Sequence, residues 1–175
     1  AERLQADLRQ QGLAVHTIRA DLARHDETVG MAREIAQRSG PLRAVLNNAS
    51  LFEPDTGSDF DPAQLRAQLE VNLIAPLLLG KELARQATGP DACVIHVLDQ
   101  KVYNLNPDYF SYTTSKLALE RAIALQAQAL APRVRVCGVA PGLMYVSGPQ
   151  APANFERASR MNLLRRPIDP ADVAR

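Results

Sequence analysis

Short apolar runs that end in polar residues alternate with longer helix-like segments along this chain. The candidate strands span residues 14–18, 43–46, 93–98 and 134–139. The candidate helices are a first one that ends near residue 11, one over 26–38, one over 61–87, one that carries Tyr112 and ends near residue 131, and one over 154–164. Strands that are separated by helices predict right-handed crossovers and a parallel sheet. We therefore expect an α/β fold with a doubly wound parallel sheet and helices on both faces.

The composition is that of one ordinary globular domain, which we expect to cover residues 1–175. Of the 175 residues, 46% are hydrophobic and 22% are charged, and the formal net charge is only +1. Lys and Arg are spread along the chain, so no nucleic-acid partner is predicted. The apolar segments are too short to span a membrane, and we expect a cytoplasmic protein. Cys93 and Cys137 lie in apolar runs, where buried thiols are more common than metal ligands, so no metal site is expected.

Both ends of the chain look like interrupted elements. Residues 2–11 read as the second half of an amphipathic helix without a start signal, and residues 170–175 read as a helix start without a continuation. The expectation at this stage is a chain that lacks the first and last strands of its fold.

Polar or unusual residues follow each of the four candidate strands. They are Asp21, the run 47–50, Asp99 and the pair Pro141-Gly142. The carboxyl ends of parallel strands meet at one rim of the sheet, where ligands bind in folds of this kind. The sequence therefore predicts one ligand site at this rim, and the helix that carries Tyr112 follows directly from it.

Tyr112 and Lys116 lie four residues apart, so on a helix they share a face. A nearby ammonium favours the phenolate, and Lys116 is expected to lower the Tyr112 pKa from its ordinary value of about 10. The same spacing also arises by chance on solvated helix faces. Of the four tyrosines, however, only Tyr112 has a lysine at this spacing.

Asn72 lies inside the long apolar segment 61–87, and Pro76 follows it by four residues. Because proline has no N–H to donate to the carbonyl of Asn72, we expect the helix to kink there and to leave that carbonyl free. Our hypothesis is that the carbonyl holds a water that feeds protons towards Lys116. The alternative is an ordinary surface asparagine.

Taken in order, these motifs resemble the short-chain dehydrogenase/reductase family over essentially the whole chain. The matching residues are Asp21-Leu22, Asn47-Asn48-Ala49-Ser50, Asn72, Tyr112 with Lys116, and Pro141-Gly142. The resemblance implies a Rossmann-like fold and an NAD(P)-dependent oxidoreductase. It implies that Tyr112 donates a proton, that Lys116 lowers its pKa and holds the nicotinamide ribose, and that Asn72 supports a water in a proton relay.

The resemblance also implies where the cofactor would bind. Asp21 and Leu22 would contact the adenine, Asn48 and Ala49 the adjoining ribose, and Ser50 would lie next to them. Pro141 and Gly142 would lie along the nicotinamide. The glycine-rich phosphate loop that the family carries on its first strand and helix is not found in this sequence. NADPH is preferred by resemblance, although NAD is not excluded.

Asp99 departs from the family pattern, in which most members have serine at this position. Together with Ser50 and Phe52, Asp99 makes the chain similar to the pteridine reductase branch. In that branch the Asp partners the Tyr, and an aromatic ring stacks on the pterin. Such an enzyme transfers a hydride from NADPH to a dihydropterin ring carbon while Tyr112 protonates the adjacent nitrogen. An ionised Asp99 would oppose Lys116 and favour a protonated Tyr112.

Several alternatives stay open at this stage. Asp99 can be a simple turn residue, Asp21 can serve only to start a helix, and Phe52 can merely pack a loop. The function can also be reduction of another carbonyl or alcohol substrate, or non-catalytic cofactor binding.

Three further expectations concern the remainder of the molecule. His96 is expected to be a satisfied core histidine, and the segment from Tyr145 to Gln150, with Gly148-Pro149, has the position of a substrate-covering loop. The resemblance implies a homodimer or homotetramer that pairs through the two long helices holding Asn72 and Tyr112.

Overall fold

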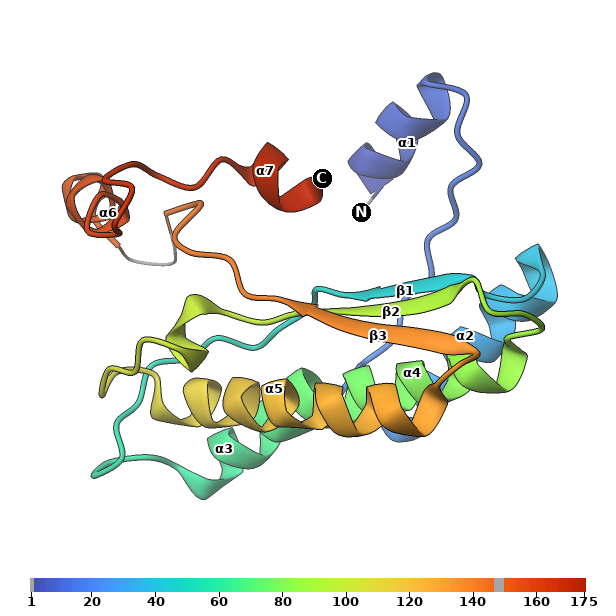
Figure 1. The fold of residues 1–175 in the computed structure, drawn as a ribbon, viewed down its shortest axis with the longest axis horizontal. Helices are drawn as coiled ribbons and strands as arrows, with labels where there is room; N and C mark the ends of the chain where they lie inside the picture. The colour runs from blue at the N-terminus through green and yellow to red at the C-terminus, as the bar shows by residue number, and fades with distance from the viewer. Residues whose placement is uncertain (1, 147–149) are drawn as a thin grey trace.

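The structure is a computed structural model of residues 1–175 and describes residues 2–146 and 150–175 (Figure 1). At its centre is a parallel sheet of three strands, β1 (Ala44–Asn47), β2 (Ala92–Val97) and β3 (Val134–Val139), in the order β1-β2-β3. The register places His96 between Asn47 and Gly138. Three of the four predicted strands and their parallel pairing are therefore confirmed.

The helices follow the predicted order. The first two are α1 (Glu2–Gln10) and α2 (His25–Ser39). The long segment comprises α3 (Pro62–Leu69), a π-helical turn η1 (Glu70–Ile74) and α4 (Ala75–Gln86). After β2 come a short 3₁₀ turn η2 (Gln100–Val102) and α5 (Phe110–Leu130), and the chain ends with α6 (Pro152–Ser159) and α7 (Pro170–Ala174). At the start of α3, Asp61 accepts a hydrogen bond from the N–H of Ala63, which confirms the predicted cap.

Helices lie on both sides of the sheet, as predicted, but they cover the two faces unequally. Figure 1 shows α2, α3, α4 and α5 on one side and α1, α6 and α7 on the other. The core lies under α4 and α5, where Leu83, Val94 and Val134 are buried. On the opposite face Leu46 is 64% exposed. The closely packed face therefore carries most of the apolar burial that stabilises this part of the chain.

The predicted strand over residues 14–18 is wrong, because the segment pairs with no strand among the described residues. A strand needs a neighbour to satisfy its backbone groups. Here the carbonyl of Val15 instead accepts hydrogen bonds from Nε2 of Gln5, at 3.0 Å, and Nε of Arg9, at 3.1 Å. Side chains of α1 take the place of a strand partner.

The predicted helix over residues 154–164 is also too long, since α6 ends at Ser159. The side-chain amide of Asn162 donates to the carbonyls of Ser159, at 2.8 Å, and Arg166, at 2.6 Å. An asparagine that hydrogen-bonds to nearby carbonyls in this way favours a turn over a helix.

His96 is a satisfied core histidine, as predicted. Its Nδ1 lies 3.3 Å from Nδ2 of Asn47, and its Nε2 lies 3.3 Å from Oε1 of Gln126. Burial, with the nearby charge of Lys116, lowers the His96 pKa, so the ring is neutral. It therefore accepts from Asn47 and donates to Gln126, linking β1 to α5 through β2. A Cβ on Gly80 would lie 2.8 Å from the Gln126 amide, so glycine lets α4 approach α5 at this point.

Within the described residues, none of the helices is both long enough and apolar enough to cross a membrane.

Candidate active site

The polar residues that follow the three strands lie together at the carboxyl rim of the sheet, as predicted. Beyond β2 and β3, the backbone N–H of Leu98 donates to Val139 at 2.7 Å, and that of Gln100 donates to Pro141 at 3.0 Å. These bonds continue the parallel register past the ends of the strands. They bring Asp99 next to the Pro141-Gly142 segment.

Tyr112 and Asp99 are joined by a direct hydrogen bond. The Tyr112 hydroxyl donates to Oδ2 of Asp99 at 3.0 Å, which confirms the predicted contact. The other carboxylate oxygen of Asp99 accepts from the N–H of Lys101 at 2.8 Å and caps η2. The sequence left two alternatives for Asp99, a turn residue or a partner of Tyr112. In the structure it is both.

Tyr112 is held in its protonated form. Burial raises the Tyr112 pKa well above its ordinary value, and the charge of Asp99 and its hydrogen bond raise the pKa further. The expectation of a lowered Tyr112 pKa is therefore wrong for this structure, in which that pKa is raised. Burial is the larger cause, and the Asp99 carboxylate, which contacts the hydroxyl directly, acts in the same direction.

Lys116 lies beside Tyr112, as the spacing predicts. Its Nζ is 5.8 Å from the centre of the Tyr112 ring and donates to the carbonyl of Val97 at 2.7 Å. Burial lowers the pKa of Lys116 to about 8, although the charge of Asp99 acts in the opposite direction. At neutral pH the ammonium therefore remains mostly charged, close to the point at which it loses its proton.

Asn72 is fully buried, so the surface alternative is wrong. Its Nδ2 donates to the carbonyl of Leu51 and to Oγ of Ser115, each at 3.0 Å. Its Oδ1 accepts from the N–H of Leu51 at 2.8 Å and from Oγ of Ser50 at 3.1 Å. The side chain thus ties the loop after β1 to α5. Sequence reasoning missed this role and missed Ser115, since neither can be inferred without the fold.

The helix is irregular where Pro76 predicts it. Residues Glu70–Ile74 form a π-helical turn, and the N–H of Ala75 reaches back to the carbonyl of Glu70. This bond is one residue longer than in an α-helix, so the interruption of the regular ladder around Asn72 is confirmed. The water that we expect at the Asn72 carbonyl remains a hypothesis.

Phe52 lies against Tyr112. Its ring is edge-on to Tyr112, with centres 4.6 Å apart and planes at 84°. It is also stacked on Tyr109, with centres 4.0 Å apart and planes at 6°. No motif in the sequence indicates this role for Tyr109, because the contact depends on how the loop after β1 folds back onto α5.

The predicted cofactor residues occupy different environments. Asn48, Ala49 and Ser50 are exposed at the rim, and Pro141 and Gly142 are half-buried. Asp21 is exposed, and its carboxylate accepts from the N–H of Ala23 at 2.9 Å in the turn before α2. Asp21 therefore closes a turn and does not cap α2, whose N-cap is Arg24, and Leu22 beside it is half-buried.

A cleft of about 890 Å³ adjoins this rim, between the loop after β2 and the segment around α6. It is lined by Gln100, Asn104, Asn106, Gly142, Leu143, Ala158, Ser159, Met161, Asn162, Leu163 and Ile168. Four of these side chains are amides and none carries a charge. Gly148-Pro149 of the predicted covering loop lies outside the described residues, and the neighbouring Tyr145 is exposed.

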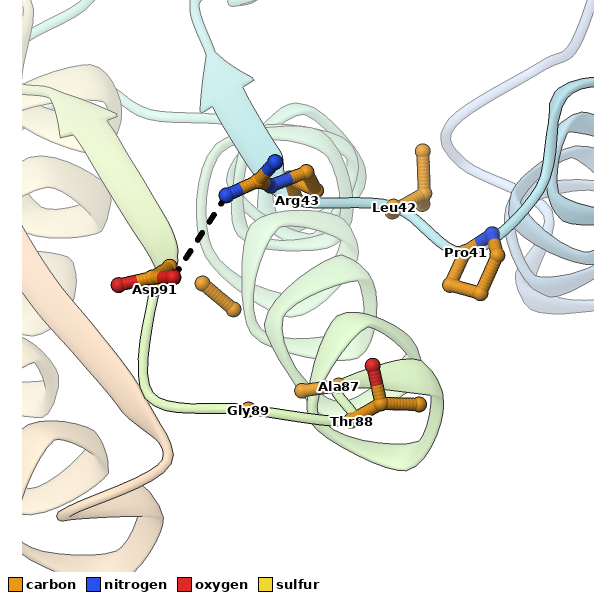
Figure 2. Close-up of a pocket in the computed structure, with 8 residues that line it drawn as sticks. Pro41, Leu42, Arg43, Ala87, Thr88, Gly89 and Asp91 are labelled. Atoms are coloured by element: carbon orange, nitrogen blue, oxygen red, sulfur yellow. Dashed lines mark ion pairs between the residues drawn. The ribbon is translucent and has the colours of Figure 1, made fainter.

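A second pocket, of about 260 Å³, lies at the opposite end of the sheet, where β1 and β2 begin. Figure 2 shows the ion pair across it, with Arg43 and Asp91 3.6 Å apart. The pocket contains none of the predicted site residues. Among the described residues there is also no cluster of His, Cys, Asp or Glu side chains placed to hold a metal ion.

Comparisons with known proteins point to one family. The family model for short chain dehydrogenases matches residues 1–154. Dihydromonapterin reductase of Escherichia coli K12 is 29% identical over 130 residues, which cover 73% of this chain and 54% of that protein. The chain thus spans about half the length of the curated relatives it matches.

Solved structures agree with this similarity. The FolM alternative dihydrofolate reductase 1 from Brucella canis, complexed with NADP, superposes with a TM-score of 0.92 at 35% identity, over 98% of this chain and 68% of that one. The corresponding Brucella suis protein, also in complex with NADP, gives 0.90 at 36% identity, over 98% and 69%.

We expect Lys116 to titrate near pH 8, and its pKa to fall further in Asp99→Asn, because the carboxylate stabilises the ammonium. NMR of protein with ¹³Cε-labelled lysine measures both values, and Lys116→Arg assigns the signal. Exposed Lys81 serves as the internal control and should be unaffected. A Lys116 pKa that is unchanged by Asp99→Asn would contradict the electrostatic link between the two residues.

Proposed function

We propose, starting from the membership of this chain in the short chain dehydrogenase family, that the protein uses NADPH to reduce a dihydropteridine. The observation that carries the proposal is the buried Tyr112 hydroxyl, hydrogen-bonded to a carboxylate beside the Phe52 ring. The similarity to a dihydromonapterin reductase and to two NADP complexes of FolM alternative dihydrofolate reductase 1 supports it.

Tyr112 is the proposed proton donor. A reduction of a C=N bond adds a hydride to carbon and a proton to the adjacent nitrogen, so the donor must carry its proton at working pH. Burial and Asp99 favour that form by raising the Tyr112 pKa. Asp99 is proposed to orient the hydroxyl and to keep it protonated until the substrate nitrogen accepts the proton.

Lys116 is proposed to stabilise the charge that Tyr112 acquires when it gives up its proton. Its ammonium lies near the Tyr112 ring, and its lowered pKa of about 8 favours proton resupply. The hypothetical water at the Asn72 carbonyl would deliver that proton. The side chain of Asn72 has a separate positioning role, because it holds Ser50 and Ser115 together.

The residues present fit a nicotinamide cofactor. An ammonium has three donors, and the one acceptor that the described residues provide for Lys116 is the Val97 carbonyl. The remaining donors suit ribose hydroxyls. Asn48, Ala49, Ser50, Pro141 and Gly142 would hold the cofactor along the rim, with Asp21 and Leu22 at the adenine. When bound, NADPH supplies the hydride.

Ser50, Phe52, Asp99 and Tyr112 are the proposed substrate contacts. Phe52 provides an aromatic surface for a planar ring, and Asp99 can accept hydrogen bonds from ring N–H or amino groups. An ionised carboxylate cannot donate to a ketone oxygen, as a serine hydroxyl does. For this reason we favour a dihydropteridine over a simple carbonyl or alcohol substrate, and over a non-catalytic role.

Asp99 offers the sharpest test of this function. The full-length protein should oxidise NADPH more efficiently with a dihydropterin than with any of a panel of ketones. Asp99→Asn keeps a cap acceptor for Lys101 but removes the charge, and we expect it, like Asp99→Ala and Tyr112→Phe, to lower kcat by about 10²- to 10⁴-fold. NADPH absorbance follows turnover, and NADPH fluorescence follows cofactor affinity, which should be little changed.

The matched control is Asp108→Ala, because Asp108 is an exposed aspartate of the same loop. It should retain wild-type turnover. Preference for ketones, or full activity in Asp99→Asn, would count against the proposal.

The uncharged cleft predicts which substituent the pteridine carries. Gln100, Asn104, Asn106 and Asn162 can hydrogen-bond to hydroxyl groups, whereas carboxylates would find no cation in the lining. We expect a dihydropterin with a short hydroxylated side chain to have a kcat/KM about tenfold or more above that of dihydrofolate, since a missing charge-assisted bond costs about 1.5–3 kcal/mol. Steady-state kinetics with both substrates measures the ratio of the two kcat/KM values. A preference for dihydrofolate would contradict the interpretation that the cleft binds an uncharged, hydroxylated side chain.

Residues 1–175 are proposed to form one Rossmann-type domain of a cytoplasmic homodimer or homotetramer. The proposed interface uses the helices that carry Asn72 and Tyr112, and α5 displays the exposed Leu125. Sedimentation of the complete protein should give a dimer or tetramer, and Leu125→Arg should weaken it if α5 lies in the interface. A monomer at micromolar concentration would contradict this proposal.

A further inference from the structure

The ring of Phe52 is held on one face by Tyr109. The two rings are nearly parallel, with planes at 6° and centres 4.0 Å apart. The same Phe52 ring meets Tyr112 edge-on at 4.6 Å. A single side chain therefore contacts both the residue that precedes α5 and the proposed proton donor one turn further on.

Tyr109 adopts an unusual backbone conformation to make this contact. Its φ of 58° and ψ of 49° lie in the left-handed region. Residues with bulky side chains rarely adopt this conformation, and they do so only singly. Such conformations persist where surrounding contacts determine them, and they are common at functional sites. Tyr109 still closes the first turn of α5, since its carbonyl accepts from the N–H of Thr113 at 2.8 Å.

Asp55 locks the Phe52 loop to the same point. Tyr109 itself provides no side-chain cap for α5. Instead Oδ1 of Asp55 accepts from the N–H of Ser111 at 3.0 Å, and its backbone carbonyl accepts from Phe110 at 3.3 Å. A carboxylate is favourable at the N-terminus of a helix because the free N–H groups and the helix dipole attract negative charge. The loop is thus attached to the start of α5 through two of its residues, Phe52 and Asp55, which are three positions apart in the chain.

Lys101 adds a further contact to Tyr109. Its Nζ lies 5.4 Å from the centre of the Tyr109 ring, within the range of a cation–π interaction, and donates to Oδ1 of Asn106 at 2.7 Å. Asn106 lines the large cleft. The Tyr109 ring therefore connects the Phe52 loop with the cleft-lining loop after β2.

We propose that Tyr109 and Asp55 are positioning residues that hold Phe52 as a fixed platform for the planar ring of the substrate. One face of Phe52 is taken by Tyr109, so a substrate ring stacks on the remaining surface beside the Tyr112 hydroxyl. A platform that is already ordered loses less conformational entropy on binding than a mobile loop does. The inference rests on the proposed function for the identity of the planar substrate, and it adds two residues that no motif in the sequence singles out.

The first test separates binding from chemistry. Tyr109→Ala should raise KM for the dihydropterin by about 2- to 12-fold, the equivalent of one aromatic pair, with kcat changed less than twofold. The conservative variant Tyr109→Phe keeps the ring and should have the wild-type KM. The control is Tyr103→Ala, since Tyr103 is 68% exposed and should have no effect. An unchanged KM in Tyr109→Ala would overturn the inference. So would a lower KM, because it would mean that Tyr109 occupies the substrate's place.

The second test asks whether Tyr109 acts through Phe52. If it does, Phe52→Ala alone and Phe52→Ala with Tyr109→Ala should have the same KM, because the platform is already lost in the single variant. Fully additive effects would show that Tyr109 acts independently of Phe52. Asp55→Ala should raise KM in the same way, whereas Asp55→Asn, which keeps a cap acceptor, should raise it less.

Direct binding distinguishes a failure of this inference from a failure of the proposed function. The Kd of an oxidised pterin for the NADP⁺-bound protein, from quenching of pterin fluorescence, should rise in Tyr109→Ala by the same factor as KM. Pterin binding without turnover would refute the proposed reaction while the Kd series still tests the platform. Turnover with an unaltered Kd in Tyr109→Ala would refute the platform alone, and neither binding nor turnover would refute both.

Discussion

The site depends above all on the side chain of Asn72. With no exposure to solvent, its amide makes four hydrogen bonds, two to the backbone of Leu51 and two to the hydroxyls of Ser50 and Ser115. These bonds fix the loop after β1 against α5. Because Ser115 in turn donates to the carbonyl of Tyr112 at 2.7 Å, the same amide sets the distance between Phe52 and the proposed proton donor. A buried polar network of this kind specifies one arrangement, since each unpaired group would be costly.

Charge balance around Tyr112 follows from this arrangement. A carboxylate contacts the hydroxyl, and an ammonium lies beside the ring. Tyr112 and Lys116 are buried, whereas Asp99 is half-buried. Burial disfavours phenolate and ammonium alike, and it therefore raises the Tyr112 pKa and lowers the Lys116 pKa. The two groups become a protonated donor and a cation that readily exchanges its proton, which is the combination that a reduction at neutral pH requires.

Asp99 and the uncharged cleft together restrict the chemistry further. Asp99 shares its two oxygens between Tyr112 and the backbone of η2, so the geometry around the proposed proton donor is coupled to the loop that lines the cleft. Phe52, Tyr109 and Asp55 make a second connection, between the loop after β1 and the start of α5. The proposed substrate recognition and the proposed proton transfer therefore rest on the same few contacts.

The order of strands and helices was predictable, because hydrophobic periodicity and cap residues such as Asp61 act locally. The grouping of Asp99, Tyr112 and Lys116 at one rim was also predictable, since parallel strands place their carboxyl ends together. The segment 14–18 was not, because an apolar run becomes a strand only when another strand is beside it.

By itself, the sequence determined which side chains meet at the rim and that the helix is interrupted near Pro76. Only the tertiary structure decided which way the Tyr112 pKa moves, because burial and the 3.0 Å contact with Asp99 are properties of packing. It alone also placed Asn72, Tyr109 and Asp55 against Ser115, Phe52 and Ser111 respectively, which are distant in the chain and are reached only through long-range contacts.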